Sequence, residues 1–135
     1  MLVVSGAVSC GAHITGSEPT NLQDRQAAAG IGQPYLISVL SDIFSKKKLV
    51  VAQILLTEDI FRSDVRKKNL LELLNLYTER GVIAIINEND AVELNSFAGN
   101  DFLSAHVAKL IGAHKVLILS TMTGSKHGVG GGKSK

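Results

Sequence analysis

Residues 81–105 read GVIAIINENDAVELNSFAGNDFLSA, and this stretch decides the expected fold. It begins with the unbroken apolar run 82–86, which is typical of a strand covered on both faces in a parallel sheet. Residues 87–90 then replace the apolar run with amides and carboxylates. Because open α/β sheets bind ligands at the carboxyl ends of their strands, we expect these four residues at a binding site.

A second polar cluster, Gly99–Asn100–Asp101, precedes the amphipathic segment 102–111. Asn100 or Asp101 can cap the helix expected there while facing the same sheet edge. Asn and Asp are also ordinary turn and cap residues, so a purely structural role stays open for each of them. Two such clusters around one buried strand and one helix start favour a site.

Composition restricts the class of protein. The chain has 135 residues, which suits one domain, and its net charge of +2 is too small to imply a nucleic-acid or membrane partner. The single cysteine, Cys10, excludes an intramolecular disulfide. No apolar run reaches the roughly 18 residues that span a bilayer, and no signal peptide precedes Ser5. These features predict a soluble, cytoplasmic protein.

The first residues predict a strand that ends at Val4 and a turn, Ser5–Gly6–Ala7, that leads into a helix through about Ala12. Such a turn presents free backbone N–H groups to an anion, and the Ser5 hydroxyl could add a donor. The spacing is equally compatible with Ser5 as a simple helix cap.

Strands and helices are expected to alternate along the rest of the chain. The pattern predicts helices over 22–29 and 34–44 with an interruption at 30–32, a strand over 49–56, a helix over 66–80, a short hairpin arm over 92–95, a helix over 101–112 and a buried strand over 116–119. This alternation indicates an α/β fold, a three-layer α/β/α sandwich with a mostly parallel central sheet. The histidines, His13, His106, His114 and His127, show no metal-ligand spacing, and we expect no metal site built by the protein.

The C-terminal segment 124–135 is rich in glycine and lysine. Successive glycines let backbone amides approach a polyphosphate, and lysines neutralise its charge. The segment departs from a Walker A loop, because His127 stands where the first glycine of that motif should fall. A flexible tail remains an equally good interpretation.

Six stretches carry a resemblance to a known family. They are VVSGAVSCG from Val3, QAAAGIGQP from Gln26, VAQILLT from Val51, VIAIINENDAV from Val82, FAGNDFLSA from Phe97 and GVGGGKSK from Gly128. Together they span nearly the whole chain and resemble the glutamate 5-kinases of the amino acid kinase family. The asparagine-rich cluster followed by Gly-Asn-Asp distinguishes that group from the acetylglutamate and aspartate kinases.

The resemblance implies ATP-dependent phosphorylation of the γ-carboxylate of L-glutamate to glutamyl 5-phosphate, the first step of proline biosynthesis, with Mg²⁺. It implies glutamate binding by Ser5, Gly6, Ala7, Asp90 and Asn100, with Asn87 in the same pocket. It implies that Asp101 organises the catalytic lysines and that Lys135 is the catalytic lysine of the nucleotide loop. The implied nucleotide-binding residues are Ser120, Thr121, Val129, Gly130, Gly131, Gly132, Lys133, Ser134 and Lys135. It also implies a homo-oligomer assembled through helices of the glutamate half.

The chain departs from the family pattern at both ends. The family's first strand, with its catalytic lysine and Gly-Thr-Ser turn, does not occur, Gly99 replaces an aspartate, and Ser120–Thr121 replace a Thr-Asp pair. We therefore expect a single domain over 1–135 that is mainly the glutamate-binding half, with a shortened nucleotide part over about 113–135. Two interpretations remain open: a glutamate 5-kinase truncated at both ends, or an inactive remnant that keeps a glutamate-binding or oligomerising role.

Overall fold

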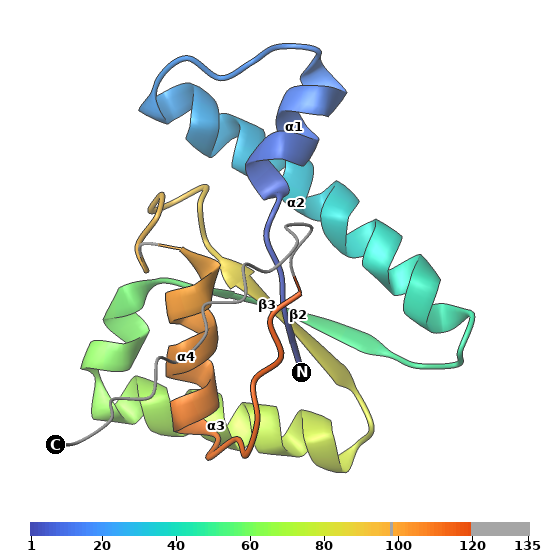
Figure 1. Cartoon of the computed structure of the whole chain (residues 1–135), viewed down its shortest axis with the longest axis vertical. Helices are drawn as coiled ribbons and strands as arrows, with labels where there is room; N and C mark the ends of the chain where they lie inside the picture. The colour runs from blue at the N-terminus through green and yellow to red at the C-terminus, as the bar shows by residue number, and fades with distance from the viewer. Residues whose placement is uncertain (98, 120–135) are drawn as a thin grey trace, which may run out of the picture.

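The computed structural model describes residues 1–97 and 99–119 (Figure 1). Within these ranges the strands are β1 (Leu2–Val3), β2 (Val51–Leu56) and β3 (Ile83–Glu88). The helices are α1 (Ala7–Thr15), α2 (Leu22–Ser45), α3 (Asp64–Glu79) and α4 (Asn100–Leu110), with a 3₁₀ helix, η1 (Glu58–Arg62), between β2 and α3. The strands form an open, all-parallel sheet in the order β1-β3-β2. The α/β fold with a parallel sheet, predicted from the sequence, is confirmed.

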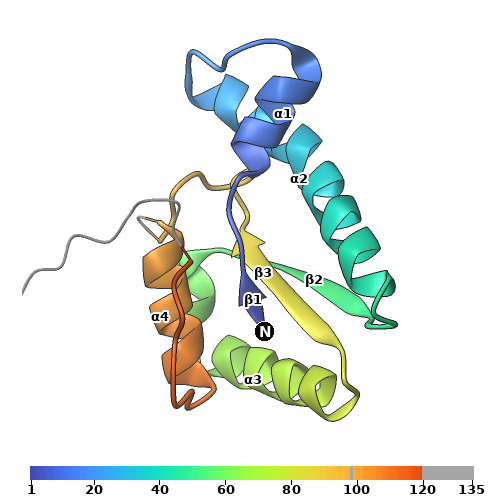
Figure 2. The ribbon, with the colours of Figure 1, turned by 45° about the vertical axis from the view of Figure 1, so that its right-hand side comes forward.

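Helices lie on both sides of the sheet, with α3 and α4 against one face and α2 on the other (Figure 2). The two faces follow from the alternation of side chains along β3. Ala84 and Ile86 face α3 and α4 and join the core around Leu74 and Leu103. Asn87, which alternation places on the opposite face, hydrogen-bonds to Gln33 of α2. The central strand is therefore covered on both sides, as the unbroken apolar run predicts.

Strand β3 continues beyond its apolar residues. The expected run was 82–86, but the strand extends through Asn87 and Glu88, which pair with Leu55 and Leu56 of β2. The backbone N–H of Asn89 then donates to the carbonyl of Leu56 at 2.8 Å. Pairing with β2 thus fixes the backbone positions of residues 87–89, the first polar residues after the apolar run.

The prediction of two helices separated by Gly30–Gly32 is wrong, because α2 runs unbroken through these residues and through Pro34. The reason is the crossing of α1 over α2. A Cβ on Gly32 would lie 1.9 Å from the carbonyl oxygen of Ala7, and a Cβ on Gly11 would lie 1.9 Å from that of Ala28. These glycines allow two helices to touch through their backbones, which no local pattern reveals.

Two further sequence predictions are wrong. The expected hairpin arm at 92–95 consists of turns, with the backbone N–H groups of Val92 and Glu93 both donating to the carbonyl of Asn89. The expected buried strand at 116–119 has no strand structure, and its side chains are 48–82% exposed. An apolar run becomes a buried strand only where neighbouring strands pair with it, and no strand among the described residues does so here. No described helix combines the length and apolar character needed to cross a membrane.

Candidate functional site

The carboxyl ends of β1 and β3 lie side by side and place the two predicted polar clusters at one edge. Val3 pairs with Ile86, and the backbone N–H of Val4 donates to the carbonyl of Ile86 at 2.9 Å. Ser5 therefore follows β1 at the same edge where residues 87–90 follow the apolar part of β3. Helix α4, which begins at Asn100, packs against both strands.

A pocket of about 510 Å³ runs from this edge along β1 and α4. Its wall includes Ser5, Asn100 and Asp101, brought together from β1 and α4 as the sequence predicts. The wall also includes Ser104 and Lys115, which sequence reasoning did not identify. Their signal is weak in the sequence, because a lone serine in a helix and a lone lysine after it have many structural roles. These polar groups interrupt a wall that is otherwise mostly apolar, and Ser5, Asn100 and Asp101 lie at its carboxyl-edge end.

The helix starts at this edge keep their first amides free of side-chain caps. The N-cap of α1 is Gly6, in the left-handed region at φ 107°, and that of α4 is Gly99, at φ 122°. Neither helix start has a side-chain cap among the described residues, so the alternatives in which Ser5 caps α1, or Asn100 or Asp101 caps α4, are not realised. Free N–H groups at two helix N-termini favour binding of an anion.

Asn87 and Asp90 differ in how deeply they are buried and in which groups they contact. Asn87 is 1% exposed, and both ends of its amide are engaged: Nδ2 donates to Oε1 of Gln33, and Oδ1 accepts from the backbone N–H of Glu88, each at 2.9 Å. Asp90 is half-buried and lines a second, small hollow together with Ala7 and Gln33. Asp90 is therefore accessible from this hollow, whereas both ends of the Asn87 amide are occupied by protein partners.

Burial raises the pKa of the Asp90 carboxyl above its ordinary value. The backbone N–H of Asn95 and the charge of Arg25 oppose that shift only partly. The N–H of Asn95 lies 3.3 Å from Oδ1 of Asp90. A desolvated carboxylate without a full ion pair is well suited to a ligand ammonium group, because the ammonium would relieve the cost of its burial.

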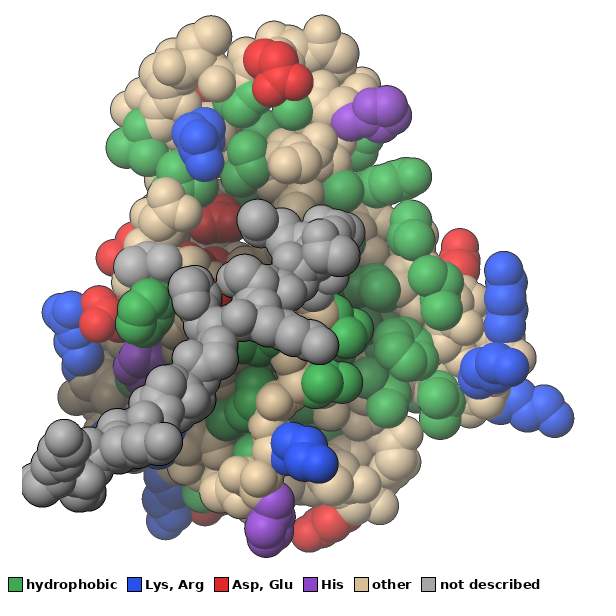
Figure 3. All heavy atoms as spheres, in the orientation of Figure 1, with side chains coloured by type: hydrophobic (Ala, Val, Ile, Leu, Met, Phe, Trp, Pro, Cys, Tyr) green, Lys and Arg blue, Asp and Glu red, His purple; other side chains and the backbone are tan. Residues whose placement is uncertain are grey.

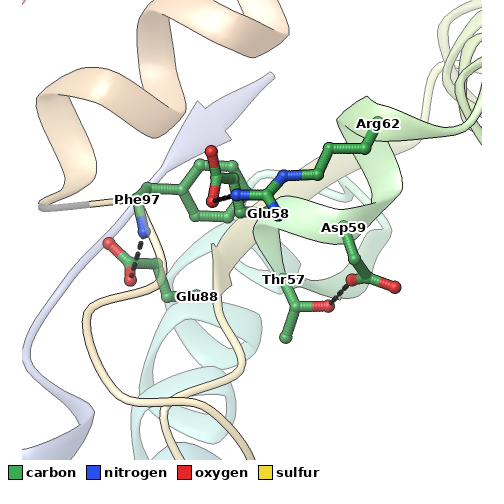
Figure 4. Close-up of polar contacts among 6 residues, drawn as sticks. All are labelled: Thr57, Glu58, Asp59, Arg62, Glu88 and Phe97. Atoms are coloured by element: carbon green, nitrogen blue, oxygen red, sulfur yellow. Dashed lines mark hydrogen bonds and ion pairs between the residues drawn. The ribbon is translucent and has the colours of Figure 1, made fainter.

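Glu88, one of the four polar residues expected at this edge, is a buried carboxyl to which the family resemblance assigns no role. Its Oε2 accepts from the backbone N–H of Phe97 at 3.5 Å, which ties the loop before α4 to the end of β3 (Figure 4). The polar residues after β2 instead pair among themselves: the Thr57 hydroxyl donates to Asp59, and Arg62 lies 2.6 Å from Glu58. Glu88 therefore positions the loop that leads into Asn100 and Asp101.

Replacing Glu88 is expected to change the pH dependence of stability. Burial, reinforced by the nearby charge of Asp90, raises the pKa of Glu88 above its ordinary 4.5, although the backbone N–H groups of Phe97, Gly99 and Ser96 lower it in part. The folded protein then binds this proton more tightly than the unfolded chain. The stability that this tighter proton binding adds is fully present below pH 4.5, and it is lost as pH rises through the pKa of Glu88 in the folded protein. Glu88→Gln should remove that loss.

The measurement is urea denaturation of both proteins between pH 4 and pH 8. The difference in unfolding free energy, variant minus wild type, should increase with pH. Shifts at exposed acids such as Asp24 and Asp59, whose pKa values are lowered by hydrogen bonds, occur in both proteins and cancel. A difference that stays constant with pH would contradict the assignment.

The predicted nucleotide-binding residues lie outside the described residues. They comprise Ser120, Thr121, Val129, Gly130, Gly131, Gly132, Lys133, Ser134 and the predicted catalytic Lys135. The described part of the chain holds no group of three His, Cys, Asp or Glu side chains that could bind a metal ion.

The fold and this edge define a class of protein. An open parallel sheet with helices on both sides, whose carboxyl edge gathers polar side chains and free helix N-termini around a pocket, is typical of α/β proteins that bind small anionic ligands. The chain belongs to the amino acid kinase family, whose model matches residues 1–124.

Curated relatives agree with the family assignment. The chain is 42% identical to glutamate 5-kinase 2 of Bacillus subtilis, over 92% of this chain and 34% of that protein. It is 37% identical to glutamate 5-kinase of Listeria innocua, over 92% of this chain and 48% of that protein. It is 40% identical to glutamate 5-kinase of Aquifex aeolicus, over 93% of this chain and 37% of that protein. The chain thus spans between a third and a half of the length of these relatives.

Proposed function

We propose that this chain is the glutamate-binding half of a kinase that transfers the γ-phosphoryl group of ATP to the γ-carboxylate of L-glutamate, giving glutamyl 5-phosphate for proline synthesis. One observation carries the proposal: Ser5, Asn100 and Asp101 line one pocket, and Ala7 and Asp90 line a separate small hollow at the same sheet edge. The names of the relatives support glutamate as the acceptor.

The charges at the edge suit the two ends of the acceptor. The Asp90 carboxylate would bind the ammonium group at one end, and the Ser5 hydroxyl and the Asn100 amide would hold the γ-carboxylate at the other. The Nδ2 group of Asn100 would donate to that carboxylate, whereas its Oδ1, which is buried and accepts no hydrogen bond from the described residues, is available to a donor on a ligand. Fixed polar groups of this kind reduce the entropy cost of bringing two reactants together.

In-line transfer between two anions requires positive charge and N–H donors. The free amides of α1 and α4 would supply N–H donors from the described residues, whereas Lys115 follows the C-terminal end of α4, away from the Asn100 end of the pocket. Lys135 and the glycine-rich segment 129–134 would add the nucleotide contacts. Mg²⁺ normally binds through one or two carboxylates plus substrate phosphates, so it would enter with ATP and neutralise phosphate charge, and Asp101 is an acid in the pocket wall that could contribute a ligand.

The test is incubation of the 135-residue chain with Mg²⁺, ATP and L-glutamate in the presence of hydroxylamine, which traps an acyl phosphate as its hydroxamate. Glutamyl hydroxamate should form with L-glutamate, and much less with L-aspartate, which is one methylene shorter. Absence of hydroxamate together with retained glutamate binding would favour the inactive remnant. Absence of both would overturn the proposal.

We also propose that the chain forms a homo-oligomer through α2. Ile31, Tyr35, Val39 and Ile43 recur every four residues along this helix and are all exposed. Figure 3 shows hydrophobic side chains gathered along the flank that α2 forms. A continuous apolar stripe on a helix is stabilised when another surface covers it.

Val39→Lys is expected to lower the mass of the assembly measured by light scattering, because it places a charge in the stripe. Ser38→Lys, at the adjacent exposed position of the same helix, should leave that mass unchanged. Equal masses for wild type and both variants would contradict an interface on this stripe.

A further inference from the structure

We propose that Gln33 of α2 is a substrate-binding residue, whose side-chain N–H donates to one oxygen of the substrate's α-carboxylate, and that Asn87 is the positioning residue that orients it. The inference rests on the proposed function, because it assigns one end of the amino-acid substrate. Gln33 and Asn87 lie 54 positions apart in the chain and meet in the interior.

The orientation of both amides follows from one backbone group. The backbone N–H of Glu88 can only donate, and it lies 2.9 Å from Oδ1 of Asn87. The Asn87 oxygen must therefore face Glu88, and its Nδ2 must face Gln33. Since Nδ2 also only donates, the atom of Gln33 that lies 2.9 Å away must be its oxygen, Oε1. Nε2 of Gln33 is left pointing away from this bond.

That remaining NH₂ group is buried and unpaired. Gln33 is only 8% exposed, and its Nε2 finds no acceptor among residues 1–97 and 99–119. Buried donors in folded proteins nearly always have a partner, because an unpaired one has lost its hydrogen bond to water. The other end of this amide is fixed by its hydrogen bond to Asn87, so the unpaired donor indicates a ligand that supplies the acceptor.

The surroundings select the chemistry of this acceptor. Gln33 lines a hollow of about 10 Å³ together with Ala7, the first residue of α1, and with Asp90. The hollow has room for about one oxygen atom. The uncapped N-terminus of α1 favours negative charge, whereas the Asp90 carboxylate favours positive charge.

An α-amino acid carries both charges on one carbon. Its carboxylate oxygen would enter the hollow against Gln33 and the first turn of α1, and its ammonium group would remain beside Asp90. The γ-carboxylate of glutamate would then extend toward Ser5 and Asn100 in the larger pocket. Gln33 thus distinguishes an α-amino acid from an amine that lacks the α-carboxylate.

The test compares two ligands in matched variants by calorimetry: L-glutamate, and 4-aminobutyrate, which is glutamate without its α-carboxylate. Gln33→Met keeps the length of the side chain and removes the donor. Gln23→Met changes an exposed glutamine of the same helix and serves as control. In Gln33→Met, L-glutamate should bind about 10- to 100-fold more weakly, as expected for loss of a hydrogen bond to a charged group, while 4-aminobutyrate should be unaffected. The control should match wild type with both ligands.

Asn87→Asp provides a second variant if Gln33→Met does not fold. The aspartate oxygen would accept from Gln33 Nε2, which turns the Gln33 oxygen toward the hollow and should cause the same selective loss of L-glutamate. Equal weakening of both ligands would show a packing role and overturn the inference. Unchanged L-glutamate affinity would show that a water satisfies Nε2 and would also overturn it. Failure of the wild-type chain to bind L-glutamate would instead overturn the proposed function and, with it, this assignment.

Discussion

Gly32→Ala is expected to lower the free energy of unfolding by about 3 kcal/mol or more, because a methyl group cannot fit between α1 and α2. Its Cβ would lie 1.9 Å from the carbonyl oxygen of Ala7 and 2.4 Å from the backbone nitrogen of Gly11. Both are backbone atoms, which cannot rotate away as a side chain could. The helices would have to separate, and Ala7, at the candidate site, would move with α1.

Gly30→Ala, two residues earlier in the same helix, provides the matched control. A Cβ there meets only the Cβ of Ala91, at the ordinary contact distance of 3.7 Å. Because alanine favours helix over glycine, this variant should be about 0.5–1 kcal/mol more stable than wild type. Urea denaturation of the three proteins measures both effects. Similar stabilities for the two variants would contradict the close helix crossing.

Asp90→Ala is expected to weaken L-glutamate binding by about 2–4 kcal/mol, or roughly 30- to 1,000-fold, because it removes the carboxylate proposed to bind the ammonium group. Burial raises the pKa of Asp90, so its charge is costly in the free protein and becomes favourable once a cation is bound. For the same reason, glutamate affinity in wild type should fall as pH decreases through the pKa of Asp90. Calorimetric titrations at several pH values measure both effects.

Glu93→Ala is the control for this substitution. Glu93 is exposed and lies in the same loop, so its removal changes the net charge equally without touching the hollow. Its L-glutamate affinity should remain within about twofold of wild type. A comparable loss in both variants would show that Asp90 acts only through the general charge of the loop.

Much of the site follows from the sequence because parallel strands bring their ends to one edge. The apolar run before Asn87 indicates a covered strand, and the residues after such a strand must lie at the sheet's carboxyl edge. Ser5 reaches the same edge because β1 pairs with β3 in parallel. These expectations need only the direction and order of the strands.

The remaining features depend on contacts between distant residues. Gly32 interrupts the helical pattern of its own segment, yet a glycine is required there because the backbone of Ala7, in another helix, lies against it. Glu88 belongs to the polar cluster expected at the site, but nothing in the local pattern shows that it is a buried carboxyl that accepts from the Phe97 backbone. Gln33 resembles any helical glutamine until Asn87 fixes its amide. No local pattern carries this information.

The central claim is that Ser5, Asp90 and Asn100 form one cradle for a small amino acid. The most direct measurement is a titration of the ¹⁵N-labelled chain with L-glutamate, followed through its backbone amide resonances. The account predicts saturable shifts that concentrate at residues 5–8, 88–91 and 99–101. Shifts that concentrate instead on the C-terminal half of α2, or that reach only one of the three segments, would contradict it.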